Sequence, residues 1–136
     1  MKHITFLTPD DVIEINRRLC LRDDNPHHCY GIGKVESALH STFYPGEPPY
    51  QHGGVVSVAA AMAYYLNQAH AFVDGNKRTA MTSALVFMNE NGWAINYPRE
   101  PVNTLADLIE GCAAGNLGID EMKEWFEFHK VKIGEQ

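Results

Sequence analysis

The chain has 136 residues, 45% of them hydrophobic, and a net charge of −6 at pH 7. This length and composition predict one folded domain over residues 1–136. The negative charge predicts no direct binding to nucleic acid, because nucleic-acid-binding proteins carry a basic face. No stretch reaches the roughly 18 consecutive apolar residues of a membrane-spanning helix, and the first residues, MKHITFLTPDD, lack the apolar segment of a signal peptide. The three cysteines are an odd number with irregular spacing, so we expect no disulfide framework and a cytoplasmic protein.

The first half of the chain predicts two helices. Residues 8–11, Thr-Pro-Asp-Asp, are typical of a helix start, with a hydroxyl N-cap, proline in the first turn and acids beside it. This helix should run to about Leu21. A loop over residues 22–33 follows, and then a short helix over residues 34–40.

Residues 41–54, STFYPGEPPYQHGG, contain three prolines and three glycines, which exclude a regular helix. Its backbone could form an extended flap that pairs with a strand of a partner. An ordinary surface loop is the alternative.

The second half returns to helical periodicity. The alanine-rich helix predicted from Val55 to about Ala69 should lie near the centre, because small side chains let neighbouring helices approach closely. Further helices are expected over residues 76–91, 101–114 and 119–130, with Trp125, Phe126 and Phe128 docking the last one on the core, and residues 93–97 could be extended. The fold expected is all-α: a compact bundle of about six helices with a flap-like loop before the central helix.

Polar residues gather in one stretch between two apolar helices, HAFVDGNKRT, residues 70–79. Asn76 is predicted to open a helix, whose first turn carries unpaired N–H groups and the positive end of the helix dipole. Lys77 and Arg78 add positive charge there, which is unfavourable for the helix alone but suits a bound phosphate. Gly75 lets the backbone approach a ligand closely, because it has no Cβ.

Two side chains of the same loop suit catalysis. Asp74 could hold Mg²⁺, which binds through one or two protein carboxylates together with phosphate oxygens. His70 carries an imidazole, the side chain that most often serves as a general base. Phe72 should anchor the loop in the core. Each residue type is common in ordinary loops, so the combination at a helix start carries the prediction of a phosphate-binding loop.

HAFVDGNKRT resembles the signature loop of the Fic/Doc (Fido) superfamily, H-P-F-x-D/E-G-N-G-R. It is similar in particular to the loop of the Doc (death-on-curing) branch, which has lysine where Fic proteins have the second glycine. FLTPDDVIEIN resembles the family's first helix, and GKVESAL resembles its G-x-L-E-S-A-L segment. The resemblance covers nearly the whole chain and implies a compact helical fold.

The resemblance also implies roles for the loop residues. His70 would take the proton from the hydroxyl of a target protein, and Asp74 would hold Mg²⁺. Gly75 and Asn76 would shape the anion pocket, and Arg78 would hold a phosphate.

Lys77 is the residue that separates the two branches. Its ammonium adds a point charge on a phosphate and alters how the nucleotide lies, which favours transfer of a phosphate over transfer of AMP. Ala71, Thr82 and Gln68 depart from the usual Fic pattern, and these departures weaken the expected nucleotide contacts.

The activity implied is that of a Doc-like toxin, which uses ATP and Mg²⁺ to phosphorylate a threonine of translation elongation factor Tu, blocks translation, and is neutralised by a separate antitoxin protein. AMP transfer to a protein hydroxyl and a non-catalytic Fido binding module remain alternatives. Cysteine and histidine are zinc ligands, so a zinc site is a further alternative, formed by Cys20, His27, His28 and Cys29.

Overall fold

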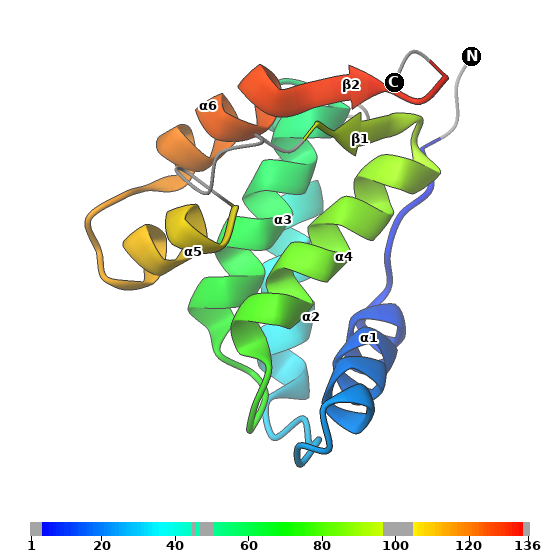
Figure 1. Ribbon diagram of the computed structural model, residues 1–136, viewed down its shortest axis with the longest axis vertical. Helices are drawn as coiled ribbons and strands as arrows, with labels where there is room; N and C mark the ends of the chain where they lie inside the picture. The colour runs from blue at the N-terminus through cyan, green and yellow to red at the C-terminus, as the bar shows by residue number, and fades with distance from the viewer. Residues whose placement is uncertain (1–3, 45, 47–50, 97–104, 135–136) are drawn as a thin grey trace.

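A computed structural model describes residues 4–44, 46, 51–96 and 105–134 (Figure 1). The described residues form six α-helices, one 3₁₀ turn and two short strands. In chain order they are α1 Pro9–Arg22, α2 Ile32–Phe43, η1 Gln51–Gly53, α3 Val55–Ala69, α4 Asn76–Glu90, β1 Trp93–Ile95, α5 Leu105–Ala113, α6 Ile119–His129 and β2 Lys130–Lys132. The prediction of a compact helical fold is confirmed, with a two-stranded sheet added to it.

Helix α1 begins where the sequence predicts. The Thr8 side chain accepts a hydrogen bond from the Asp11 N–H at 3.2 Å, and the Asp11 carboxylate accepts one from the Thr8 N–H at 2.9 Å. This reciprocal capping box satisfies two backbone donors that would otherwise lack a partner. Pro9 lies in the first turn, where its missing N–H costs nothing.

Helix α3 is the centre of the molecule and packs against α2, α4 and α6. Its alanines at positions 59, 60, 61 and 63 are completely buried. Because methyl side chains occupy little space, the neighbouring helices come close to the α3 backbone, as the alanine content predicted. Figure 1 shows α3 and α4 side by side, joined at their lower ends by residues 70–75.

The two strands lie at the opposite end of the α3–α4 pair from this connecting loop (Figure 1). They pair antiparallel, with Trp93 opposite Lys132 and Ile95 opposite Lys130. The sequence predicts the extended stretch at Trp93. It does not predict β2, because the apolar pattern indicates a last helix that continues to residue 130. Strand β2 forms because the fold brings residues 130–132 beside β1.

Two other predictions need correction. Helix α2 continues to Phe43, past the predicted end at residue 40, because Thr42 and Phe43 are buried against the core. Phe128 is 84% exposed and does not dock α6. The helix buries Met122, Trp125 and Phe126, which share one face at spacings of three and four residues, and Phe128 lies off that face.

Residues 45, 47–50 and 97–104 lie outside the described part of the chain. The central portion of the predicted flap and the predicted start of the fifth helix at residue 101 therefore fall there. Of the helices that are described, none combines the length and the apolar character needed to cross a lipid bilayer.

Candidate functional site

The loop between α3 and α4 turns through two left-handed residues. His70 ends α3 at φ 50°, ψ 51°, and Gly75 precedes α4 at φ 78°, ψ 17°. A Cβ on Gly75 would lie 3.1 Å from the amide nitrogen of Asn16 and 3.3 Å from the sulfur of Cys20. Glycine is required here both by the positive φ and by the closeness of α1.

Asn76 closes the loop with its side chain. Its Oδ1 accepts a hydrogen bond from the Phe72 N–H at 3.0 Å, and its Nδ2 donates to the Phe72 carbonyl at 2.8 Å. The oxygen and the nitrogen of the amide are therefore both engaged in shaping the loop. Phe72 is 4% exposed and anchors the loop as predicted, whereas Val73 beside it is exposed.

Helix α1 supports the loop from one side, through a residue that sequence reasoning missed. Asn16 is 2% exposed, and its Nδ2 donates to the Asp74 carbonyl at 2.8 Å and to the Thr79 hydroxyl at 3.0 Å. Val12, Asn16 and Cys20 are buried on one face of α1 at four-residue spacing. A lone asparagine in an otherwise apolar stripe was the signal that could have revealed this support.

The segment between α1 and α2 also supports the loop. Phe72 forms an antiparallel bridge with Cys29, and the Val73 N–H donates to the His28 carbonyl at 3.0 Å. The Tyr30 hydroxyl donates to the His70 carbonyl at 2.9 Å. The backbone of residues 70–75 is thus fixed by contacts with distant parts of the chain.

The first turn of α4 faces the loop without a side-chain cap. Gly75 occupies the N-cap position and offers no acceptor, and the first turn contains no acidic residue. The Thr79 N–H donates to the Gly75 carbonyl at 2.8 Å, which leaves the N–H groups of residues 76–78 without an acceptor inside the helix. Together with the helix dipole, these donors form the kind of site that binds a phosphate.

Both predicted phosphate-binding cations are paired with carboxylates. The Lys77 ammonium lies 2.5 Å from a Glu110 oxygen of α5, and the Arg78 guanidinium pairs with Asp23 at the end of α1. The side chains of Lys77 and Arg78 are 39% and 51% exposed. A phosphate that enters the site would replace Glu110 and Asp23 as the partner of these two cations.

His70 and Asp74 are the predicted base and metal ligand. The His70 side chain is exposed, and no described residue forms a hydrogen bond with its ring or with the Asp74 carboxylate, which is half-buried. Both groups are therefore available to a ligand. One free carboxylate beside an uncapped helix start is a donor set that would suit Mg²⁺, whose remaining ligands would be phosphate oxygens and water.

The charges of the site extend to Cys20, beneath the loop. Burial raises the pKa of the Cys20 thiol, and the negative charge of Asp74 raises it further, whereas the positive charge of Arg78 lowers it. Cys20 is therefore a neutral thiol at neutral pH and packs as a small apolar group.

The zinc alternative is not supported. Within the described part of the chain, no three His, Cys, Asp or Glu side chains converge in a way that could hold a metal ion. Cys20, His27, His28 and Cys29 all belong to that part.

Gln68, one of the departures from the Fic pattern, donates to the Cys112 carbonyl of α5 at 3.1 Å and so links α3 to α5.

Comparison with known proteins adds two findings. The protein-family model described as the Fic/DOC family matches residues 6–88, a range that contains α1, the whole of the loop and most of α4. A curated protein, "Protein kinase doc" of Escherichia phage P1, is 36% identical over 67 residues, which cover 49% of this chain and 50% of that protein. The chain thus matches about half the length of that relative.

Proposed function

Because this chain belongs to the Fic/DOC family, we propose that it is a Doc-type toxin that transfers the terminal phosphate of ATP to a hydroxyl of a protein. The observation that carries the proposal is the loop over residues 70–79. It combines a free histidine, a free carboxylate and an uncapped helix end on a backbone fixed by α1 and by the segment before α2.

His70 is the general base of the proposed reaction. Its ring is exposed, and its backbone is fixed by the Tyr30 hydroxyl. A neutral imidazole would accept the proton of the target hydroxyl as the oxygen attacks the terminal phosphorus of ATP. The bond between that phosphorus and the bridging oxygen breaks, and ADP leaves.

The first turn of α4 binds the phosphates in this proposal. The free N–H groups of residues 76–78 and the side chains of Lys77 and Arg78 supply donors and positive charge at one place. Asp74 would hold Mg²⁺, and a bound Mg²⁺ would supply positive charge for the phosphate oxygens. Gly75 and Asn76 keep the turn in the shape that exposes these donors.

Lys77 is the reason for proposing phosphate transfer over AMP transfer. A lysine ammonium occupies space and adds charge where a glycine would leave room for a diphosphate. The name of the phage P1 relative, a protein kinase, supports the same choice. The free side chains of His70 and Asp74 support a catalytic protein over a binding module that has lost its activity.

We propose translation elongation factor Tu as the target, through a threonine, so that the reaction blocks translation. A separate antitoxin protein would restrain the toxin, and both would act in the cytoplasm. Co-expression with the product of the adjacent reading frame should restore the growth of cells that express this chain.

The direct test incubates the purified protein with elongation factor Tu, Mg²⁺ and ATP labelled on either the α or the γ phosphate. We expect the γ label alone on threonine. His70→Ala should abolish transfer, whereas His27→Ala, an exposed histidine outside the loop, should not. Transfer of the α label would establish AMP transfer instead, and transfer of neither label would refute the proposed reaction with this target.

A further inference from the structure

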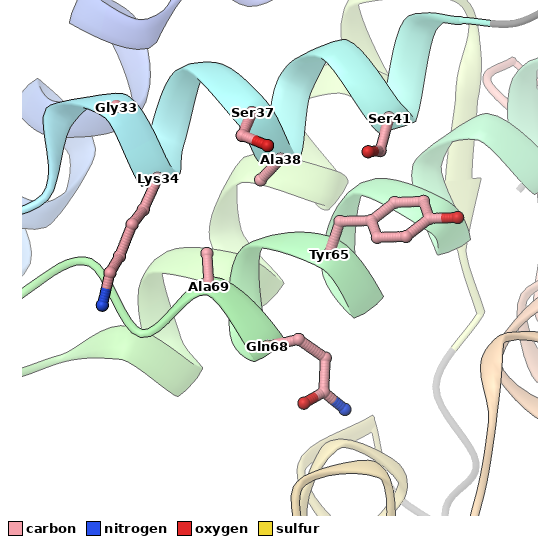
Figure 2. Close-up of a pocket in the computed structure, with 8 residues that line it drawn as sticks. All are labelled: Gly33, Lys34, Ser37, Ala38, Ser41, Tyr65, Gln68 and Ala69. Carbon is pink, nitrogen blue, oxygen red and sulfur yellow. The ribbon is translucent and has the colours of Figure 1, made fainter.

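A groove runs between α2 and α3 and begins beside the catalytic loop. A pocket of about 530 Å³ forms its first part, and a second pocket of about 320 Å³ extends it. Ser41 and Tyr65 line both pockets, which makes them parts of one feature that we call the α2–α3 groove. Figure 2 shows the Tyr65 ring of α3 facing Ser41 of α2 across it.

One end of the groove adjoins His70. Ala69, the residue before His70, is part of its wall, and Figure 2 shows Lys34 reaching past the end of α3 at the same place. The Lys34 ammonium lies 5.6 Å from the centre of the Tyr30 ring, and the hydroxyl of Tyr30 donates to the His70 carbonyl. A molecule in the groove would therefore lie next to the proposed base.

The length of the groove matches a short piece of extended polypeptide. On the α2 side its described lining reaches from Gly33 of α2 to Tyr44, the residue after α2, which is about 16 Å at the rise of an α-helix. An extended chain advances about 3.3 Å per residue, so four or five residues would fill this length. The hydroxyls of Ser37, Ser41 and Tyr65 are suited to hydrogen bonds with such a backbone.

The described lining of the groove lacks acidic side chains, in a protein that is acidic overall. The chain has a net charge of −6, yet no carboxylate is among the described residues that line either pocket. Lys34 lies at one end, and at the other the ammonium of Lys123 lies 3.3 Å from His52. An acidic chain whose described groove residues include no acid favours an acidic ligand there.

We propose that the α2–α3 groove binds an extended acidic segment of the protein substrate, next to the hydroxyl that is phosphorylated. This inference rests on the proposed function, since it assumes that the substrate is a protein. A nucleotide is a poor fit, because the phosphate-binding donors lie on α4, which does not line the groove.

The test measures binding of two fluorescein-labelled peptides by fluorescence anisotropy. Both are short, extended sequences of alternating serine and charged residues around one threonine, with glutamate in the first peptide and lysine in the second. We expect the acidic peptide to bind and the basic peptide not to bind at the same concentration. Equal binding of the two, or no binding of the acidic peptide, would overturn the proposal.

Variants of exposed residues locate the binding site. Lys34→Glu should weaken binding of the acidic peptide roughly fivefold or more, because it replaces an attraction by a repulsion. Ser37→Glu, one turn further along α2, should weaken it as well. Lys132→Glu makes the same change of charge on β2, at the other end of the molecule, and should leave binding unchanged (Figure 1). If Lys34→Glu and Lys132→Glu behave alike, the groove is not the site.

Repeating the peptide-binding measurement with saturating Mg²⁺ and ATP shows whether the peptide and the nucleotide occupy different sites. The acidic peptide should remain bound, and displacement would show that the groove belongs to the nucleotide, which overturns the proposal. Peptide binding is measured without any reaction. The proposed groove and the proposed phosphate transfer can therefore be refuted independently. Groove-dependent peptide binding without any phosphate transfer would keep the groove and refute the proposed function.

Discussion

Asn16 offers the sharpest test of how the loop over residues 70–79, the proposed catalytic loop, is positioned. It is buried under the loop, and its amide donates to the Asp74 carbonyl at 2.8 Å and to the Thr79 hydroxyl at 3.0 Å. Asn16→Ala removes both hydrogen bonds, which leaves the Thr79 hydroxyl without this donor and the Asp74 carbonyl with only the weak Cys20 S–H donor at 3.7 Å. The loop residue that would hold Mg²⁺ then loses its fixed backbone.

The size of the effect follows from these contacts. A hydrogen bond between neutral groups contributes about 1 kcal/mol, and a buried polar group left without a partner costs about 1–3 kcal/mol. The missing amide also leaves a small cavity. We expect Asn16→Ala to lower the free energy of unfolding by about 2–4 kcal/mol, a large part of the roughly 5–15 kcal/mol of an ordinary domain.

Urea unfolding measures the loss, with Asn89→Ala as the matched control. Asn89 is exposed on α4, so the same substitution there should change the free energy of unfolding by less than about 0.5 kcal/mol. Asn16→Asp, which keeps the shape but turns the donor into an acceptor, should lose at least as much at neutral pH. A loss at Asn16→Ala no greater than that of the control would show that these buried contacts do not hold the loop.

Three more predictions concern the same site. Gly75→Ala should lower the free energy of unfolding by about 1–3 kcal/mol in urea titrations, because the left-handed backbone strains an alanine and its Cβ would meet α1. Glu110→Gln and Asp23→Asn should each raise ATP affinity about two- to fivefold in calorimetry at low salt, since each frees a cation, and the gain should shrink as salt is added. Burial raises the pKa of the Cys20 thiol above its ordinary 9.0, so its contribution to stability is complete below pH 9 and is lost as the pH rises through the folded-state pKa. Unfolding titrations should therefore show the wild type losing more stability above pH 9 than Cys20→Ala does, and equal losses would contradict this.

The sequence alone determined the features that depend on neighbouring residues. The hydroxyl N-cap at Thr8, the proline and acids after it, and the spacing of apolar residues predicted the helices, because caps and helix faces are local. The order of residues in HAFVDGNKRT predicted a phosphate-binding helix start, because the donors of a helix's first turn need only the residues that form it. The same stretch predicted that Gly75 precedes the helix and that Phe72 is buried in the core.

The tertiary structure decided what depends on segments distant in the chain. Asn16 and Tyr30 reach the loop only because α1 and the segment before α2 pack against it. Glu110 and Asp23 meet the two cations for the same reason. The α2–α3 groove and strand β2 also arise between elements, and the exposure of Phe128 depends on which face α6 turns to the core. Periodicity marks an apolar face, but only packing determines which partner it meets and which polar side chains are brought together beside it.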